Sequence, residues 1–309
     1  MKKTSAQTSA APAKRVTVSD LPFSMLLENA DTMSAMLIGG VKSILPFKSD
    51  STGNAAVLKT MPAPSARLLK AFANWCGSSA DVSHVPAPLV CGKITLPVVS
   101  ELTARSPYPL LSVLNQGVHL RIHKPLPLNE PILLEGRLLD ASDDGYRARI
   151  CSEVIVGTAS TPNAMTVEAI AAVMLKPRPT SETVPQRVEP EFETIGEWQA
   201  AANEGQTFFW LTGDFNPIHT VPALAKRTRF RGCIMHGYGA FAQVFSCLER
   251  SGAVLTDIEV RFLSPLPLPS PKLLIQRAKT ADENDRIAFK LMDEQGKVYQ
   301  AGHYLKTPN

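Results

Sequence analysis

An internal repeat is the feature that most limits what this chain can fold into. Residues 125–137 read PLPLNEPILLEGR and residues 265–277 read PLPLPSPKLLIQR, with proline, leucine and arginine at the same offsets. A weaker, ungapped echo lies upstream of each copy, at residues 72–86 and 208–222. Because the two echoes occur in the same order in both halves, we expect two similar domains in one chain.

A polar, proline-rich stretch at residues 176–192 separates the two copies. Such a sequence cannot build a hydrophobic core and is typical of a linker. We therefore predict an N-terminal tail and lead-in segment at 1–60 and a first domain at 61–178. The linker is predicted at 179–192 and the second domain at 193–309.

Each half is predicted to place helical sequence before a run of strands. Helices are expected around 65–76 and 197–211, and apolar residues from Ile234 to Leu248 indicate a long buried helix. The expected strands are 116–123, 131–139, 146–156 and 168–175 in the first half and 256–263, 272–279, 286–292 and 298–305 in the second. One helix before four or five antiparallel strands favours a curved sheet around a helix, and pairing two such units would bury their edges.

Composition and charge exclude several classes of protein. With 44% hydrophobic residues, the chain is too apolar to be disordered. Its 32 basic and 28 acidic residues give a formal charge of +4 and are scattered, which argues against a nucleic-acid-binding protein. The five cysteines are odd in number and form no CxxC pair, so neither a disulfide framework nor a zinc site is expected. These cysteines suit a reducing interior.

The N-terminal region carries weaker signals. Residues 1–19 contain four basic and no acidic residues, and no apolar stretch follows them as in a secretory signal. A cytosolic tail is the preferred interpretation, and an organelle transit peptide is the alternative. The apolar segment from Met33 to Leu45 is too short for a membrane span, which needs about 20 residues, so we expect packing rather than membrane contact.

The most informative motif is LTGDFNPIH, which ends at His219. Asp214 and His219 stand five residues apart with Pro217 between them. Because proline disfavours a helical conformation in the residue before it, the chain is expected to leave its helix at Asn216. A carboxylate and an imidazole at the two ends of such a turn can hold a water molecule and move a proton.

A second motif, IMHGY at residues 234–238, opens the predicted buried helix. If the helix begins at Gly237, the positive end of its dipole and its backbone amide can bind a ligand oxygen. The residues alone leave structural alternatives open. The Asp-Phe-Asn-Pro sequence also makes good turns and caps, and His236 can be a buried, hydrogen-bonded residue.

The string GDFNPIH, followed by Pro222, Ala225, Phe230 and IMHG, resembles the signature of the MaoC-like dehydratases. This family includes the R-specific enoyl-CoA hydratases, which have hot-dog folds. The two-copy layout resembles the double-hot-dog members of the family. The resemblance implies an α+β double hot-dog fold, with two antiparallel sheets each wrapped around a long central helix.

The resemblance also implies roles for individual residues. Asp214 and His219 match the dyad that activates water for addition to a 2-enoyl thioester. Asn216 matches a polar residue that orders the site, and Gly237 matches the glycine whose N–H polarises the thioester carbonyl. His236 is placed with the substrate-binding and site-ordering residues. The resemblance implies neither a metal nor a redox cofactor.

The first half lacks this dyad. In the ungapped alignment, Ser78 and Ser83 occupy the places of the aspartate and the histidine. His84 lies one residue off and has no carboxylate partner at the matching spacing. We therefore expect one catalytic site per chain. Apolar first-half residues such as Leu89 and Val90 either line an acyl pocket or pack in the core.

The predicted function is reversible hydration of a trans-2-enoyl thioester to the (R)-3-hydroxyacyl thioester. The expected partner is an acyl-CoA substrate, with acyl carrier protein as the other carrier; nucleic acid and membrane are not expected. One chain forms a pseudo-dimer, with a homodimer as a further option. The location is predicted to be cytoplasmic, or an organelle matrix if residues 1–19 are a transit peptide. The alternatives are a non-catalytic acyl-thioester-binding subunit and another hot-dog enzyme such as a thioesterase.

Overall fold

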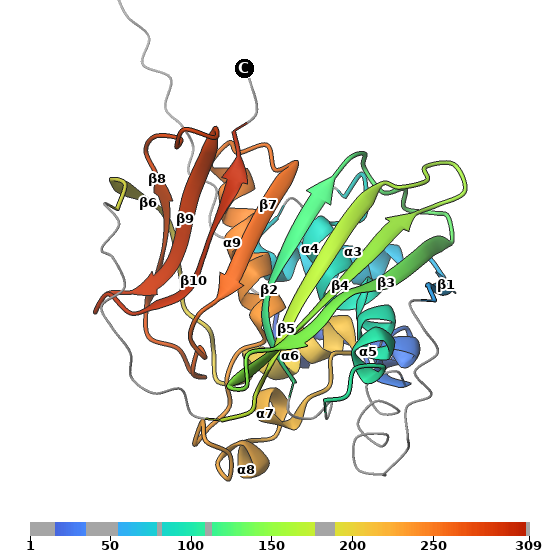
Figure 1. The fold of residues 1–309 in the computed structure, drawn as a ribbon, viewed down its shortest axis with the longest axis horizontal. Coiled ribbons are helices and arrows are strands. Elements are labelled where there is room, and N and C mark those ends of the chain that lie inside the picture. The colour runs from blue at the N-terminus through green and yellow to red at the C-terminus, as the bar shows by residue number, and fades with distance from the viewer. Residues whose placement is uncertain (1–15, 35–54, 79–81, 109–112, 177–188, 307–309) are drawn as a thin grey trace, which may run out of the picture.

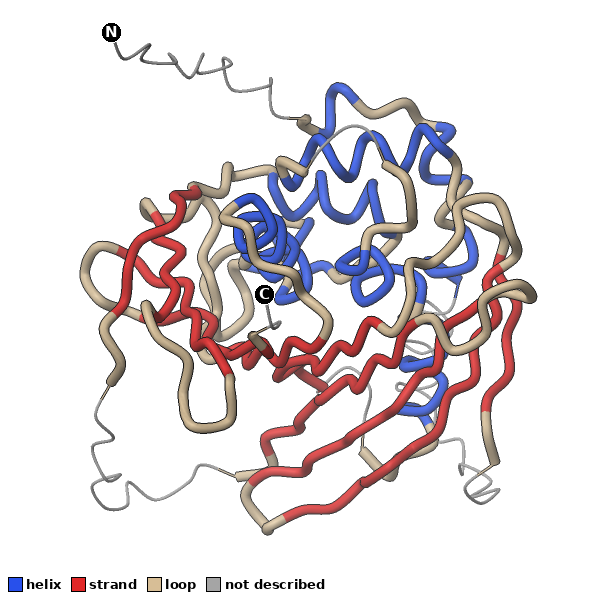
Figure 2. The backbone as a smooth tube through the Cα atoms, turned by 90° about the horizontal axis from the view of Figure 1, so that it is seen from above, coloured by secondary structure: helices blue, strands red, loops and turns tan. Residues whose placement is uncertain are grey.

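The computed structural model describes residues 16–34, 55–78, 82–108, 113–176 and 189–306. Ten strands form one antiparallel sheet in the order β1-β3-β4-β5-β2-β7-β10-β9-β8-β6. Figure 1 shows the strands side by side across the molecule, and Figure 2 shows that most of the helices lie on one face of the sheet.

The strands divide into two sets of five with the same internal order. The first set is β1 (Val57–Met61), β2 (Val113–Ile122), β3 (Ile132–Asp143), β4 (Arg147–Gly157) and β5 (Met165–Met174). The second set is β6 (Phe192–Trp198), β7 (Asp257–Phe262), β8 (Leu273–Ala278), β9 (Arg286–Asp293) and β10 (Val298–Leu305). All eight of the strands predicted from the sequence are present, and β1 and β6 add one edge strand to each set.

The helices precede or interrupt these strands. The N-terminal segment holds η1 (Val18–Asp20) and α1 (Ser24–Leu27). The first half holds α3 (Ala66–Cys76), α4 (Ala87–Leu89), the π-helical turn η2 (Val90–Ile94) and α5 (Leu96–Ala104). The second half holds α6 (Glu204–Thr212), α7 (Pro217–Thr220), α8 (Pro222–Ala225) and α9 (Gly237–Arg250).

The two halves meet through one strand pair. Antiparallel pairing of β2 with β7 sets His119 opposite Glu259 and joins the halves edge to edge into a single sheet. The expected pairing of the two units thus takes the form of one continuous sheet, in which each half keeps its own five-stranded order. Pairing removes one exposed edge from each half, because the backbone groups of β2 and β7 satisfy one another.

The observed strands also bear on the predicted boundaries. β1 begins at Val57 and pairs with β3, so the first half begins before residue 61. β6 begins at Phe192, the last residue of the predicted linker. Both strands lie at the outer edges of the sheet and start each half.

The helix that packs against the sheet is continuous in the second half and interrupted in the first. In the second half it is the continuous, 14-residue α9, almost wholly buried as the apolar run from Ile234 predicts. In the first half the corresponding stretch is broken into α4, η2 and α5. Pro88 and Pro97 each lack an amide donor and stand in the first turn of α4 and α5, where proline is tolerated.

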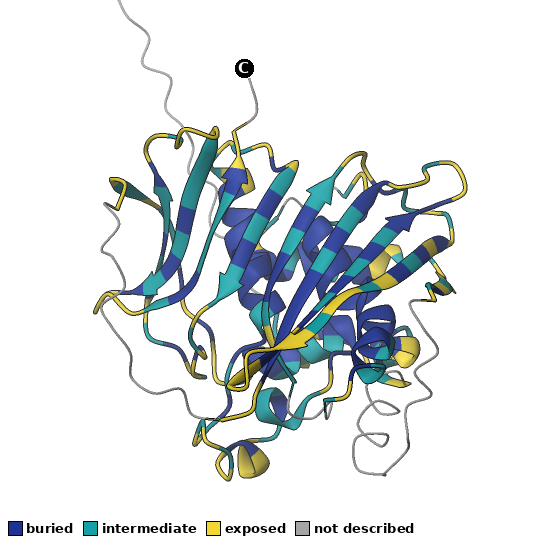
Figure 3. Ribbon diagram, in the orientation of Figure 1, coloured by how far each residue is buried: buried dark blue, intermediate teal, exposed yellow. Residues whose placement is uncertain are grey.

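One hydrophobic core spans both halves and fills the space between the sheet and its helices. Phe72 and Trp75 of α3, Phe208 of α6 and Phe241 of α9 are almost completely buried in it. Figure 3 shows the helices against the sheet mostly buried, α8 largely exposed, and strands that alternate between buried and more exposed residues. This alternation has the period of two expected of a sheet with one covered face.

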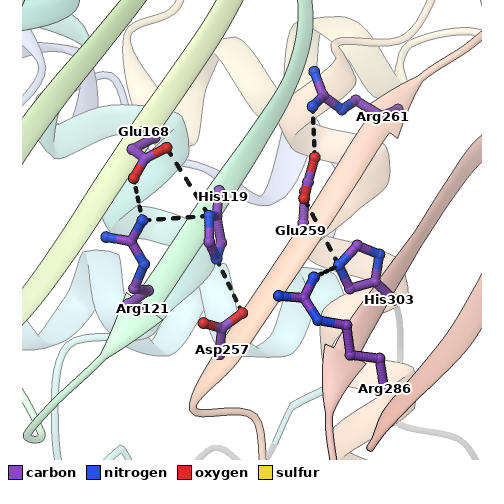
Figure 4. Close-up of polar contacts among 8 residues, drawn as sticks. All are labelled: His119, Arg121, Glu168, Asp257, Glu259, Arg261, Arg286 and His303. Carbon is purple, nitrogen blue, oxygen red and sulfur yellow. Dashed lines mark hydrogen bonds and ion pairs between the residues drawn. The ribbon is translucent and has the colours of Figure 1, made fainter. Parts of the chain in front are cut away.

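The uncovered face carries a polar row across the junction of the halves (Figure 4). Glu168, His119, Glu259 and His303 stand on four neighbouring strands and face one another in register. Nε2 of His119 donates to Oδ1 of Asp257 at 2.9 Å. Polar side chains directly across neighbouring strands can interact with one another, so the row adds polar contacts to the β2–β7 junction.

Some sequence predictions lie outside the described residues. These include the signals in residues 1–15 and most of the apolar segment from Met33 to Leu45. Within the described ranges, none of the helices combines the length and the apolar character needed to span a bilayer.

Candidate active site

The loop that carries the motif begins where α6 ends. Gly213 caps α6 in the left-handed conformation (φ 80°), which glycine adopts without strain. The sequence predicted that the chain leaves this helix at Asn216, and α6 in fact ends three residues earlier, at the Gly213 cap. Asn216 instead caps the next helix, because its side chain accepts a hydrogen bond from the Ile218 amide at 3.2 Å. Pro217 is the first residue of α7, a position at which proline is favoured.

His219 is held in one tautomer by α7 and the chain before α9. Its Nδ1 lies 2.8 Å from the carbonyl oxygen of Ile234, which can only accept, so Nδ1 carries the proton. Burial lowers the pKa of His219 to about 4, although the hydrogen bond to Ile234 opposes this shift. At neutral pH the ring is uncharged, and its Nε2 keeps a lone pair that can accept a proton.

His236 lies against His219 and binds the motif loop. The two ring centroids are 3.8 Å apart, and Nε2 of His236 donates to the backbone oxygen of Asp214 at 3.0 Å. Burial and the neighbouring His219 hold the pKa of His236 well below its usual value. Its buried Nδ1 has no hydrogen-bond partner among the described residues. His236, which directly precedes α9, thus contacts both the backbone of Asp214 and the ring of His219.

Asp214 is buried behind these rings, with 6% of its surface exposed. Burial raises the pKa of its carboxyl group to about 7, since few polar groups replace the water lost on folding. A buried carboxyl that titrates near neutrality is common at functional sites, because it can gain or lose a proton during turnover.

Gly237 is the first residue of α9, as the motif predicted. Its amide and those that follow have no intrahelical partners, and the helix dipole makes this end positive. A Cβ atom at Gly237 would stand 2.4 Å from the Phe262 ring, so a larger residue does not fit. Gln300 donates from Nε2 to the Gly237 carbonyl oxygen at 2.8 Å and holds the first turn in place.

These side chains share one cleft of about 320 Å³, which is lined by Asn216, His219, His236 and Gly237. Asp214 is not among its lining residues; it is buried, and its backbone oxygen accepts the hydrogen bond from His236. The first half contributes the ends of two strands, including Val113 and Met174. No local pattern in the sequence indicated these first-half residues, Gln300 or Arg229, because tertiary packing alone brings them to the cleft.

The first half has a cleft at the related position. It measures about 520 Å³ and is lined by Ser78, Ser83 and His84 among others. Ser78 Oγ bonds Ser246 Oγ at 2.7 Å, and Ser83 Oγ bonds Nδ1 of the adjacent His84 at 3.1 Å. None of these pairs combines a carboxylate with an imidazole. The described residues also include no cluster of three or more His, Cys, Asp or Glu suited to a metal ion.

The N-terminal segment supports the motif loop from outside. Asn29 donates from Nδ2 to the Trp210 carbonyl oxygen at 2.7 Å, and it accepts a hydrogen bond from the Lys93 ammonium. Burial lowers the pKa of Lys93 to about 8. A Cβ atom on Gly213 would lie 2.9 Å from the Asn29 Cβ, so this segment presses on the residue before Asp214.

Comparison with known proteins gives relatives for both the motif and the fold. Residues 183–280 match the family described as "MaoC like domain". The peroxisomal multifunctional enzyme type 2 of Drosophila melanogaster is 24% identical over 246 residues, which cover 74% of this chain and 40% of that protein. The peroxisomal hydratase-dehydrogenase-epimerase of Neurospora crassa is 22% identical over 204 residues, covering 62% of this chain and 22% of that protein. The chain therefore spans less than half the length of these curated relatives.

The fold is shared with solved structures of MaoC-like dehydratases. The structure from Phytophthora capsici aligns with a TM-score of 0.64 and 19% identity, covering 85% of this chain and 99% of the other. At this identity the likeness establishes the fold. The predicted hot-dog architecture is thereby confirmed, with the two halves joined in one sheet.

Proposed function

We propose, on the premise that the second half of this chain is a MaoC-like dehydratase domain, that the protein hydrates 2-enoyl thioesters reversibly. The observation that carries the proposal is the shared cleft. The cleft is lined by a neutral imidazole with a free Nε2 and by the amide end of a buried helix, and the motif that supplies the imidazole also carries Asp214, a buried carboxyl group titrating near pH 7. The names of the curated relatives include a hydratase, which supports the same reaction class.

In the proposed reaction, the thioester carbonyl accepts a hydrogen bond from the Gly237 amide at the start of α9. A conjugated thioester becomes electrophilic at C3 when its carbonyl oxygen is polarised. Addition at C3 then places negative charge on that oxygen. A preorganised N–H donor and the positive end of a helix stabilise such charge, and one donor of this kind typically contributes ~10²–10³-fold to the rate.

Asp214 and His219 transfer the proton from the water molecule to the substrate. Asp214 and His219 bind a water molecule, whose O–H bond breaks as its oxygen bonds to C3. The released proton passes to the dyad and returns to C2 of the enolate, so no other reactant is consumed. His219 is suited to this transfer because its Nδ1 proton is engaged by Ile234, which leaves Nε2 as the acceptor. General acid–base groups typically contribute ~10²–10⁴-fold each.

The first half supplies a wall of the site rather than a second set of catalytic groups. Val113, Leu114 and Met174 line the cleft opposite the motif and offer an apolar surface to an acyl chain. The peroxisomal names of two relatives favour an organelle matrix over the cytoplasm as the location of this chain.

Hydration of 2-enoyl-CoA substrates of several chain lengths tests this function. We expect loss of the conjugated-thioester absorbance and formation of the R-3-hydroxyacyl product, with no release of free thiol. Thiol release would indicate a thioesterase. Saturable binding without turnover, with both coenzyme A and acyl-carrier-protein substrates, would indicate a binding subunit.

A further inference from the structure

Four of the six residues after α8 are cationic and none is acidic. The sequence KRTRFR at 226–231, here called the cationic loop, comprises Lys226, Arg227, Thr228, Arg229, Phe230 and Arg231. The other 28 lysine and arginine residues of the chain equal its 28 acidic residues. The whole formal charge of +4 can therefore be assigned to this loop.

None of the four cations of the loop has a carboxylate partner within the described ranges. Elsewhere, Arg277 pairs with Glu193 at 2.6 Å, and Lys59 pairs with Glu101 at 3.1 Å. All four loop cations are exposed to solvent. A concentrated, unpaired positive charge attracts an anionic ligand and costs little desolvation when it binds one.

The loop has a fixed shape. Thr228 donates from Oγ1 to the Ala225 carbonyl oxygen at 2.7 Å, and the same Oγ1 accepts from the Phe230 amide at 3.2 Å. Arg231 adopts a left-handed conformation (φ 57°), and its amide donates to the Thr228 carbonyl oxygen at 3.1 Å. A turn held at both ends presents its charges with a smaller entropic cost on binding than a flexible chain.

The loop borders the proposed active site. Arg229 and Phe230 line the 320 Å³ cleft with His219 and Gly237, and Arg229 is the one formally charged side chain among its lining residues. Three residues after the loop, Ile234 accepts the hydrogen bond that orients His219. An anion on the loop therefore lies at the mouth of the same cleft in which the thioester would react.

We propose that the cationic loop binds the phosphates of the coenzyme A part of the substrate. This inference rests on the proposed hydratase function and names the carrier that its site takes. Coenzyme A bears a pyrophosphate and a 3′-phosphate at the end of its pantetheine arm, far from the thioester. Arginine binds such groups well, because its planar guanidinium donates two parallel hydrogen bonds to phosphate oxygens.

The distribution of charge favours coenzyme A over an acyl carrier protein. A docked protein usually covers about 800 Å² of its partner, so its acidic surface needs cations spread over several elements. Here four exposed cations are gathered within six residues of one loop. Asn115, Gln116 and Ser264, which also line the cleft, are uncharged. A patch of this size suits the phosphates of one nucleotide.

The test compares two substrates that share the reacting thioester. We would measure kcat and KM for a 2-enoyl-CoA and for the matching 2-enoyl-pantetheine, which lacks every phosphate. The variant is Arg227→Gln/Arg229→Gln/Arg231→Gln, with Arg137→Gln, an exposed arginine on β3, as the matched control. We expect the triple variant to raise KM for the CoA substrate about 10-fold or more, with little change for the pantetheine substrate. Added salt should raise KM of the wild type more than KM of the variant.

The other outcomes are decisive as well. Equal losses on both substrates, or no loss on either, would overturn the assignment of the loop to the phosphates. A loss confined to an enoyl-acyl-carrier-protein substrate would show that the loop docks a protein instead. Absence of turnover of both small thioesters by the wild type would count against the proposed hydratase function itself, which keeps the two failures apart.

Discussion

Burial acts in opposite directions on the two residues of the proposed dyad. It raises the pKa of Asp214 to about 7 and lowers that of His219 to about 4. Near neutral pH the histidine is therefore uncharged, and the aspartate is divided between its two protonation states. When two neighbouring groups have well-separated pKa values, one can act as the acid and the other as the base in the same site.

The raised pKa of Asp214 carries a cost in stability. A carboxyl group with a pKa of 3.8 when unfolded and about 7 when folded favours the folded state only while it is protonated. Its contribution is fully present below pH 4 and is lost as the pH rises through 7. Asp214→Asn should therefore stabilise the protein by roughly 1–4 kcal/mol at pH 8 relative to the wild type, and by much less at pH 5.

Urea unfolding of both proteins at the two pH values measures this difference. Asp140→Asn, at an exposed position on β3, is the control and should change little at either pH. Equal stabilities of Asp214→Asn and the wild type at pH 8 would show that the carboxyl group is not desolvated.

Residue spacing predicted part of this site and packing decided the rest. The DFNPIH string was enough to propose Asp214 and His219 as a dyad, because both belong to one short segment. The contact of His219 with His236 depends on where the chain enters α9, and no local pattern encodes this. The buried position of Asp214 likewise follows from helices that the motif does not contain.

At the scale of elements, the strands and α9 follow the periodicity of the sequence closely. β1 and β6 are edge strands and were missed: β1 has only 5 residues, and β6 shows only partial burial along its length. The helical stretch of the first half that consists of α4, η2 and α5 was missed for another reason. Its apolar run is divided by a π-helical turn and two prolines, so it lacks the regular 3.6-residue period.

The contact between the N-terminal segment and α6 could not be foreseen from sequence. Asn29 pairs a carbonyl group near the C-terminal end of α6 with the buried ammonium of Lys93 in η2. A cation near the C-terminal end of a helix also interacts favourably with the negative end of the helix dipole. The segment thereby connects the two halves beside Asp214.

Asn29→Ala should weaken this contact. The change leaves the Lys93 ammonium and the Trp210 carbonyl group without their partner, which should cost about 2–4 kcal/mol of stability. Because Gly213 packs on Asn29, we also expect kcat to fall more than KM rises. Urea unfolding and steady-state kinetics would measure both effects, with Leu27→Ala, an exposed position in the same segment, as the control. An Asn29→Ala protein as stable and active as the wild type would refute the supporting role.

For the whole molecule, the repeat was enough to predict two similar halves. It did not reveal how they join, since a repeat does not specify which edges meet. The β2–β7 pair makes the two halves one sheet and brings the ends of β2 and β5 to the cleft of the second half. The first half can thus line the proposed site without a dyad of its own.

The central claim is that one site, in the second half, performs the hydration. The most direct measurement compares 2-enoyl-CoA hydration by the wild type, Asp214→Asn and Ser78→Ala, the last at the matching position of the first half. We predict that Asp214→Asn lowers kcat about 10²-fold or more with the fold intact by circular dichroism, and that Ser78→Ala keeps most of the activity. Full activity in Asp214→Asn, or its loss in a folded Ser78→Ala protein, would contradict this account.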